Sequence, residues 1–96
     1  MTTLAPHDIG NRPVITAAID TKGLPGVATA ATFTVTEPDG TVTVTSSPDP
    51  DIANPSENVW TYQMPVLTQF GTHLIVAQTT AGVEALRRGT LLCKSL

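Results

Sequence analysis

The sequence predicts an all-β domain, an antiparallel sandwich or barrel of about six or seven short strands. Two stretches alternate apolar residues with threonine, as strands with one buried face and one wet face do. A tight turn separates these two stretches, and further turn residues recur along the chain at the spacing of a sandwich. Threonine occurs 17 times and charged residues make up only 14% of the chain. The usual charged share is about 25%, so threonine replaces much of the expected charge.

A hairpin is the clearest local element. Residues 32–36 alternate threonine with Phe33 and Val35, and residues 41–45 alternate threonine with Val42 and Val44. The four residues between them read Glu-Pro-Asp-Gly. Proline presets the backbone for a turn, and Asp-Gly tolerates positive φ. The pattern therefore predicts two antiparallel strands joined by a tight turn.

One strand is expected before this hairpin and one after it. Residues 14–20 place Ile15, Ala17 and Ile19 on one face, and Lys-Gly-Leu-Pro-Gly at residues 22–26 ends that strand. Residues 46–56 contain three prolines and are expected to form a loop, with Ile52 held against the core. Residues 58–64 form the next strand, which Pro65 ends.

Two further strands complete the prediction. Gly71 opens a strand over residues 72–79, and Ala81-Gly82 turns the chain into a last strand that runs through Gly89 to Cys93. Residues 83–88 favour a helix, but six residues flanked by glycines are too few for a stable one. A helical turn there is the less favoured alternative.

Length and charge bound the domain count and the class of partner. The 96 residues make one domain, divided here into a polar leader or arm over residues 1–12 and the sandwich over residues 13–96. A net charge of -3 argues against nucleic-acid binding. We find no apolar run long enough for a membrane helix and no signal peptide at residues 1–12, so we expect no membrane partner and intracellular synthesis.

The titratable residues predict no catalytic, cofactor or metal site. His7 is expected in solvent, and His73 shares a face with Ile75 and Ala77, which indicates a core position. Cys93 is in phase with Leu91 and is expected to pack as a small apolar residue. One cysteine and two distant histidines do not supply the ligand spacing of a zinc site. The sequence therefore predicts a protein that is not an enzyme and carries no cofactor.

Two clusters have a structural and a functional interpretation. The acidic cluster Asp49, Asp51, Asn54 and Glu57 is expected to be a solvated loop, with calcium binding as the alternative. The pair Trp60 and Tyr62 points the same way from one strand, together with Met64. Burial in the core is the favoured interpretation, and an aromatic platform for sugars is the alternative.

The strand over residues 72–79 supplies the strongest functional signal. Leu74 and Val76 lie on the face opposite Ile75 and Ala77, so the strand is apolar on both faces. This predicts a second buried surface and hence a protein partner, unless a loop or terminus covers that face. The other residues predicted to make protein contacts are Arg87 and Arg88, with ordinary surface charge as the alternative, and Leu4 and Asp8 in the leader.

Three segments together resemble a known class of protein. They read TFTVTEPDGTVTV at residues 32–44, NVWTYQM at residues 58–64 and FGTHLIVAQTTAG at residues 70–82. In these segments the chain is similar to small immunoglobulin-like structural proteins of tailed bacteriophages, over roughly residues 8–93. The resemblance implies an immunoglobulin-like β-sandwich of about seven strands without catalytic residues. His73 stands where the family often has an aromatic residue, and the paired cysteines of secreted immunoglobulin domains are missing.

The same resemblance implies a function in the virion, after synthesis in the cytoplasm of the bacterial host. The first expectation is a head-to-tail connector of the phage neck, acting by assembly with portal, capsid, tail or other neck proteins and with copies of itself in a ring or lattice. The alternatives are a capsid decoration or minor capsid protein, and a carbohydrate- or cell-surface-binding module that uses Trp60 and Tyr62.

Overall fold

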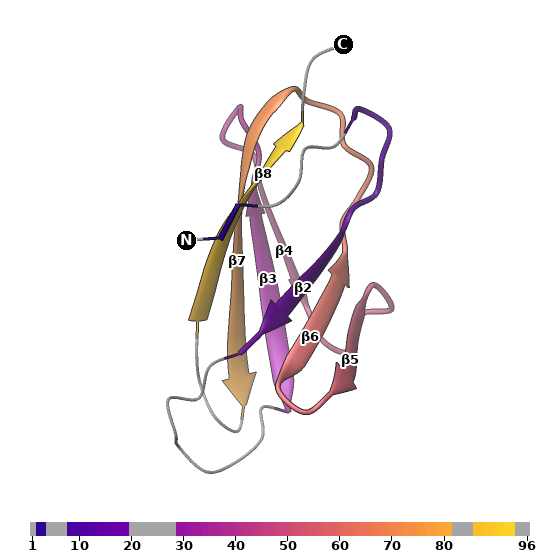
Figure 1. The fold of residues 1–96 in the computed structure, drawn as a ribbon, viewed down its shortest axis with the longest axis vertical. Helices are drawn as coiled ribbons and strands as arrows, with labels where there is room; N and C mark the ends of the chain where they lie inside the picture. The colour runs from indigo at the N-terminus through magenta and orange to yellow at the C-terminus, as the bar shows by residue number, and fades with distance from the viewer. Residues whose placement is uncertain (1, 4–7, 20–28, 82–85, 94–96) are drawn as a thin grey trace.

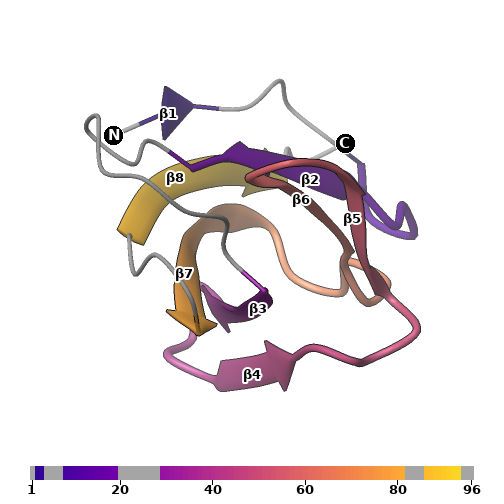
Figure 2. The ribbon, with the colours of Figure 1, turned by 90° about the horizontal axis from the view of Figure 1, so that it is seen from below.

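Two β-sheets packed face to face form the protein in a computed structural model (Figures 1 and 2). The structure describes residues 2–3, 8–19, 29–81 and 86–93, and this part of the chain contains strands and no helix. The all-β prediction is therefore confirmed. The strands are β1 (Thr2–Thr3), β2 (Val14–Ala18), β3 (Ala30–Thr36), β4 (Val42–Ser46), β5 (Ile52–Ser56), β6 (Val59–Gln63), β7 (Gly71–Ala81) and β8 (Leu86–Cys93).

The strand order is that of an immunoglobulin sandwich. One sheet has the order β1-β8-β7-β3-β4 and the other β2-β6-β5. Immunoglobulin domains pair strands B, E and D in one sheet and G, F, C and C′ in the other. β2, β6 and β5 take the first set of places, and β8, β7, β3 and β4 take the second. Strand A, which lies beside B in that pattern, has no counterpart among the described residues, because β1 pairs with β8 in parallel instead.

The core lies between the two sheets and is built from alternate residues of each strand. Phe33 of β3 stacks on Tyr62 of β6, with ring centroids 5.1 Å apart and planes at 25°. The Tyr62 hydroxyl also shares a 3.1 Å hydrogen bond with the hydroxyl of Thr45 on β4. The buried apolar side chains are Ile15, Ala17, Ile19, Ala31, Phe33, Val35, Trp60, Tyr62, Met64, Leu67, Ile75, Ala77, Leu91 and Cys93.

The predicted hairpin is confirmed as β3 and β4. Its turn is closed by hydrogen bonds from Glu37 N to Thr41 O (2.8 Å) and from Gly40 N to Glu37 O (2.9 Å). The Asp39 carboxylate accepts a 2.8 Å hydrogen bond from the Thr41 amide. This backbone bond, which favours the charged form, is the main reason that the pKa of Asp39 lies below its usual value.

The loop predicted over residues 46–56 is wrong in part, because residues 52–56 form β5. This strand pairs with β6 at Ile52 and Ala53 and again at Ser56, with an irregular register between them. β5 lies at the edge of its sheet, which is where a strand tolerates a proline such as Pro55, because proline has no N–H to donate to a neighbouring strand. Ile52 packs against the core, as expected.

Other element ends differ by a few residues from the expectation. β2 ends at Ala18, and Asp20 lies outside the described residues. β7 extends to Ala81, where a turn was expected, because its ladder with β3 continues to Ala30. The last strand already begins at Leu86, so Leu86, Arg87 and Arg88 are extended rather than helical. Residues 82–85 lie outside the described part of the chain.

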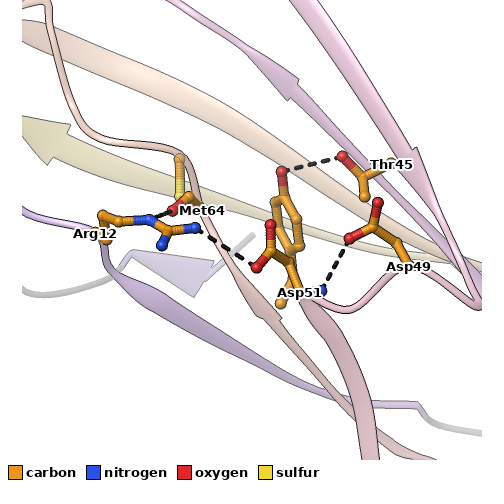
Figure 3. A network of polar contacts seen from close by, with 6 residues as sticks. Arg12, Thr45, Asp49, Asp51 and Met64 are labelled. Carbon is orange, nitrogen blue, oxygen red and sulfur yellow. Dashed lines mark hydrogen bonds and ion pairs between the residues drawn. The ribbon is translucent and has the colours of Figure 1, made fainter.

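The leader contacts the sandwich at both of its described parts. Thr2 and Thr3 pair with Gly89 and Thr90 of β8. Nearer the first core strand, Gly10 N donates to Leu67 O (2.9 Å). Figure 3 shows the next contact, in which Arg12 Nε donates to Met64 O (3.1 Å) and the same guanidinium lies 3.5 Å from an Asp51 carboxylate oxygen.

Candidate interaction face

The sheet β8-β7-β3-β4 has an outer face made of threonine and aliphatic side chains. Cross-strand partners point to the same face of a sheet, so the register defines its rows. One row runs from Val42 through Thr36 and Leu74 to Thr90, and the next runs from Val44 through Thr34 and Val76 to Arg88. We call this surface the outer face; its members are Thr32, Thr34, Thr36, Val42, Val44, Ser46, Thr72, Leu74, Val76, Gln78, Leu86, Arg88, Thr90 and Leu92.

Large apolar side chains are exposed across this face. Leu74 is 44% exposed in the central strand β7, and Val44 is 61% exposed at the sheet edge. Val42, Leu86 and Leu92 are exposed as well. Arg88 is the one charged side chain in the set. A sheet face with several exposed aliphatic side chains and a single charge is typical of a surface that packs against another protein.

Three of the residues predicted to make protein contacts lie together on the outer face. Leu74 points outward, Val76 beside it is half-buried, and both lie on the outer face. Val76 stands opposite Arg88, so the predicted Leu74, Val76 and Arg88 share one surface. No described loop or terminus covers Leu74, which is exposed.

The remaining predicted contact residues lie elsewhere. Arg87 stands opposite Ala77, and its side chain donates a 3.1 Å hydrogen bond to Ala18 O on the other sheet. It therefore crosses the seam between the two sheets rather than joining the outer face. Asp8 is half-buried near the buried Cys93, and Leu4 falls outside the described residues, as does His7.

The alternation of residues 41–45 implied that Val42 and Val44 face the core, and this expectation is wrong because both valines are exposed. The turn pairs Glu37 with Thr41, so Val35 stands opposite Thr43 and Phe33 opposite Thr45. The two threonines thus share the inward face with Phe33 and Val35, and the two valines point outward. Symmetric counting from a four-residue turn would pair Val35 with Val42 and turn both valines inward. Because Glu37 pairs with Thr41, the connection has only residues 38–40, and this one-residue change in register exchanges the two faces.

His73 is a core residue, as predicted. It is 1% exposed, and its Nδ1 lies 3.3 Å from Gly71 O. Immunoglobulin domains commonly place a tyrosine at this point, near the start of strand F, with a hydrogen bond back to nearby backbone. β7 begins at Gly71 with a φ of 119°, where an added Cβ would lie 3.0 Å from Pro38 Cγ. The Gly-Thr-His segment therefore forms a packed corner of the sandwich.

The hollow beside His73 is small. It measures about 20 Å³ and is lined by Glu37, Thr43 and Met64 among others. Its volume suits about one water molecule, which is far below the size of a substrate site. The buried Nε2 of His73 has no hydrogen-bond partner within the described residues. We therefore assign this histidine to packing.

The aromatic platform proposed as an alternative is contradicted by burial. Trp60 is 5% exposed and Tyr62 is 2% exposed, so neither ring is available to a sugar. The acidic cluster does not converge either, because Asn54 donates to the carbonyls of Ser56 and Val59 while Asp51 pairs with Arg12. Over the described ranges, no group of three or more His, Cys, Asp or Glu side chains could hold a metal ion.

The thiol of Cys93 is expected to be unreactive in the folded protein. Desolvation by burial raises its pKa above 9.0, and the negative charge of Asp8 adds to this effect. The raised pKa stabilises the fold below about pH 9, and that contribution is lost as pH rises through the higher folded value. Ellman's reagent at neutral pH should titrate the thiol only after denaturant is added. Full titration of the native protein would contradict the packing described above.

Comparison of the chain with family models, curated proteins and solved structures finds no match. The fold assignment therefore rests on the strand order and register. Within the part of the chain that the structure describes, no helix is long and apolar enough to cross a membrane.

Proposed function

We propose that this chain is a non-enzymatic assembly protein that works by packing its outer face against another protein. The observation that carries the proposal is the set of exposed Val42, Val44 and Leu74 on one sheet face. Burying apolar surface yields roughly 25 cal/mol per Å². Threonines lie between the aliphatic residues, so the face is not a continuous apolar strip.

The virion of a tailed bacteriophage is the setting that the sequence resemblance implies. Within it, the neck between head and tail is our first proposal, with portal, capsid, tail or other neck proteins as partners. A place on the capsid shell, as a decoration or minor capsid protein, is the second. Both use the same fold and the same kind of contact, and they differ in location and copy number.

Asymmetric cryo-electron microscopy of the phage particle tests this setting. Density for the domain in a ring between portal and tail is the expected result. Density spread over the shell would move the protein to the second proposal. A particle without any copy of the chain would contradict both, and the virion setting with them.

A further inference from the structure

Among the strands of the described residues, none lies beside the outer edge of β2. Met64 N donates to Pro13 O (2.9 Å) and Ile19 N donates to Asn58 O (2.8 Å), which fixes the odd-numbered residues as those whose backbone faces β6. In an antiparallel ladder the alternate residues face the other way. The backbone N–H and C=O groups of Val14 and Thr16 therefore point to an edge where no described residue bonds to them. At the end of this edge, the outward carbonyl of Ala18 accepts the hydrogen bond from Arg87.

A hollow lies along this edge. It measures about 60 Å³, is mainly apolar, and opens between β2 and β8. The side chains that line it include Ile15 and Ala17 of β2 and Ile75 of β7. This is the place where strand A would lie in an immunoglobulin sandwich. Figure 2 shows β2 beside β8 on this side of the molecule.

A second strand, β4, also has an edge that no described strand pairs with. The bonds from Glu37 N to Thr41 O and from Ser47 N to Ala31 O show that the odd-numbered residues face β3. The backbone groups of Val42 and Val44 therefore face away from the sheet. β4 contains no proline, glycine or charged residue that would discourage pairing. It lies at the far side of its sheet from β8.

The other two edges are less suited to pairing. β5 contains Pro55, has an irregular register, and uses the Asn54 side chain to bond its own turn. β8 is already paired with β1 at Gly89 and Thr90. Edges blocked in these ways do not readily add a strand.

Charge distinguishes the two open edges. Arg87 and Arg88 line the hollow beside β2. β4 has Glu37 and Asp39 in the turn before it and Asp49 in the connection after it. Opposite charges on two such edges favour their encounter and disfavour contact between like edges.

We propose that the open edge of β2 receives β4 from a second copy of this chain, so that copies associate head to tail. β2 and β4 are both five residues long, and the added strand supplies the missing neighbour and covers the hollow. Each copy has one edge of each kind on opposite sides, so the contact is heterologous and builds a ring or a filament. This inference rests on the proposed assembly function and specifies one partner.

Two proline variants test the proposal. Thr16→Pro removes an outward amide from β2, and Val44→Pro removes one from β4; neither change breaks a ladder bond within the domain. Sedimentation velocity over a series of concentrations measures association, and circular dichroism checks the fold. We expect the wild-type chain to associate and each proline variant to remain monomeric. The matched controls Thr16→Ala and Val44→Ala, which keep the amides, should still associate.

Mixing the two variants is the decisive step. Each retains the edge that the other has lost, so an equal mixture should form dimers and stop there. A monomeric wild-type chain, a proline variant that still associates like the wild type, or a mixture that stays monomeric would overturn the proposal. If association survives both prolines but is lost on substituting the outer face, this inference fails while the proposed function stands.

A charge variant avoids any backbone change and covers the case in which a proline variant does not fold. Arg87→Glu should weaken association severalfold, because Arg87 lies at the edge of β2 and is not part of the outer face. High salt should weaken association of the wild type, because exposed charges are screened. If neither the charge substitution nor high salt weakens association, the proposed pairing of these two edges is contradicted.

Discussion

Replacing Phe33 by alanine is expected to lower the free energy of unfolding by about 3–5 kcal/mol, as for a buried phenylalanine in a tight core. The ring is fully buried, and it stacks on Tyr62 from the opposite sheet. Its loss removes the main aromatic contact between the sheets. A domain of this length has a total stability of only about 5–14 kcal/mol, so the variant should be close to unfolding.

Urea denaturation followed by Trp60 fluorescence measures this effect. Trp60 is buried in the folded protein, so its emission should shift to the red on unfolding. Val44→Ala is the control, because it removes methyl groups from an exposed position and should change stability by about 0.5 kcal/mol or less. A loss below 1 kcal/mol for Phe33→Ala would mean that the two sheets are not held together as described.

The double substitution Leu74→Asp with Val76→Asp should abolish assembly and leave the domain folded. Both side chains lie on the outer face, and an aspartate at position 76 would stand opposite Arg88. Each change should lower the free energy of unfolding by only about 1 kcal/mol, which is the span of strand propensities. Truncating two central contacts of an interface typically costs about 2 kcal/mol each, which corresponds to about 1,000-fold weaker binding.

A matched control places the same charges on the other sheet. Thr61→Asp with Gln63→Asp changes two residues of β6 whose side chains point away from the core. This control should enter particles normally, as measured by quantitative mass spectrometry of purified virions. If the outer-face variant unfolds in isolation, Leu74 and Val76 belong to the core. If it folds and enters particles as well as the control does, the outer face is not the contact surface.

Much of the fold could be predicted from the sequence because local signals agreed with it. Alternation of apolar residues with threonine located β3 and β4, and the Pro-Asp-Gly turn located their connection. The burial of Ile15, Trp60 and His73 followed from period-two patterns in the same way. These features depend on neighbours in sequence, and short-range patterns report them reliably.

The features that sequence reasoning missed depend on pairing between distant segments. β5 was taken for a loop because its proline is tolerated only at an edge, and edge position is set by the order of strands. The separate roles of Arg87 and Arg88 follow from the β7–β8 register, which directs one to the seam and the other to the outer face. The open edge of β2 likewise appears only once the sheets are assembled.

The accessibility of residue 74 in the assembled particle is the most direct test of the central claim. A Leu74→Cys variant should react with a maleimide in the isolated domain, while the native Cys93 stays buried and silent. A Gln63→Cys variant provides the comparison on the opposite sheet. We predict that position 74 is protected in the particle and position 63 remains labelled. Equal labelling of position 74 in the free and assembled states would contradict the account.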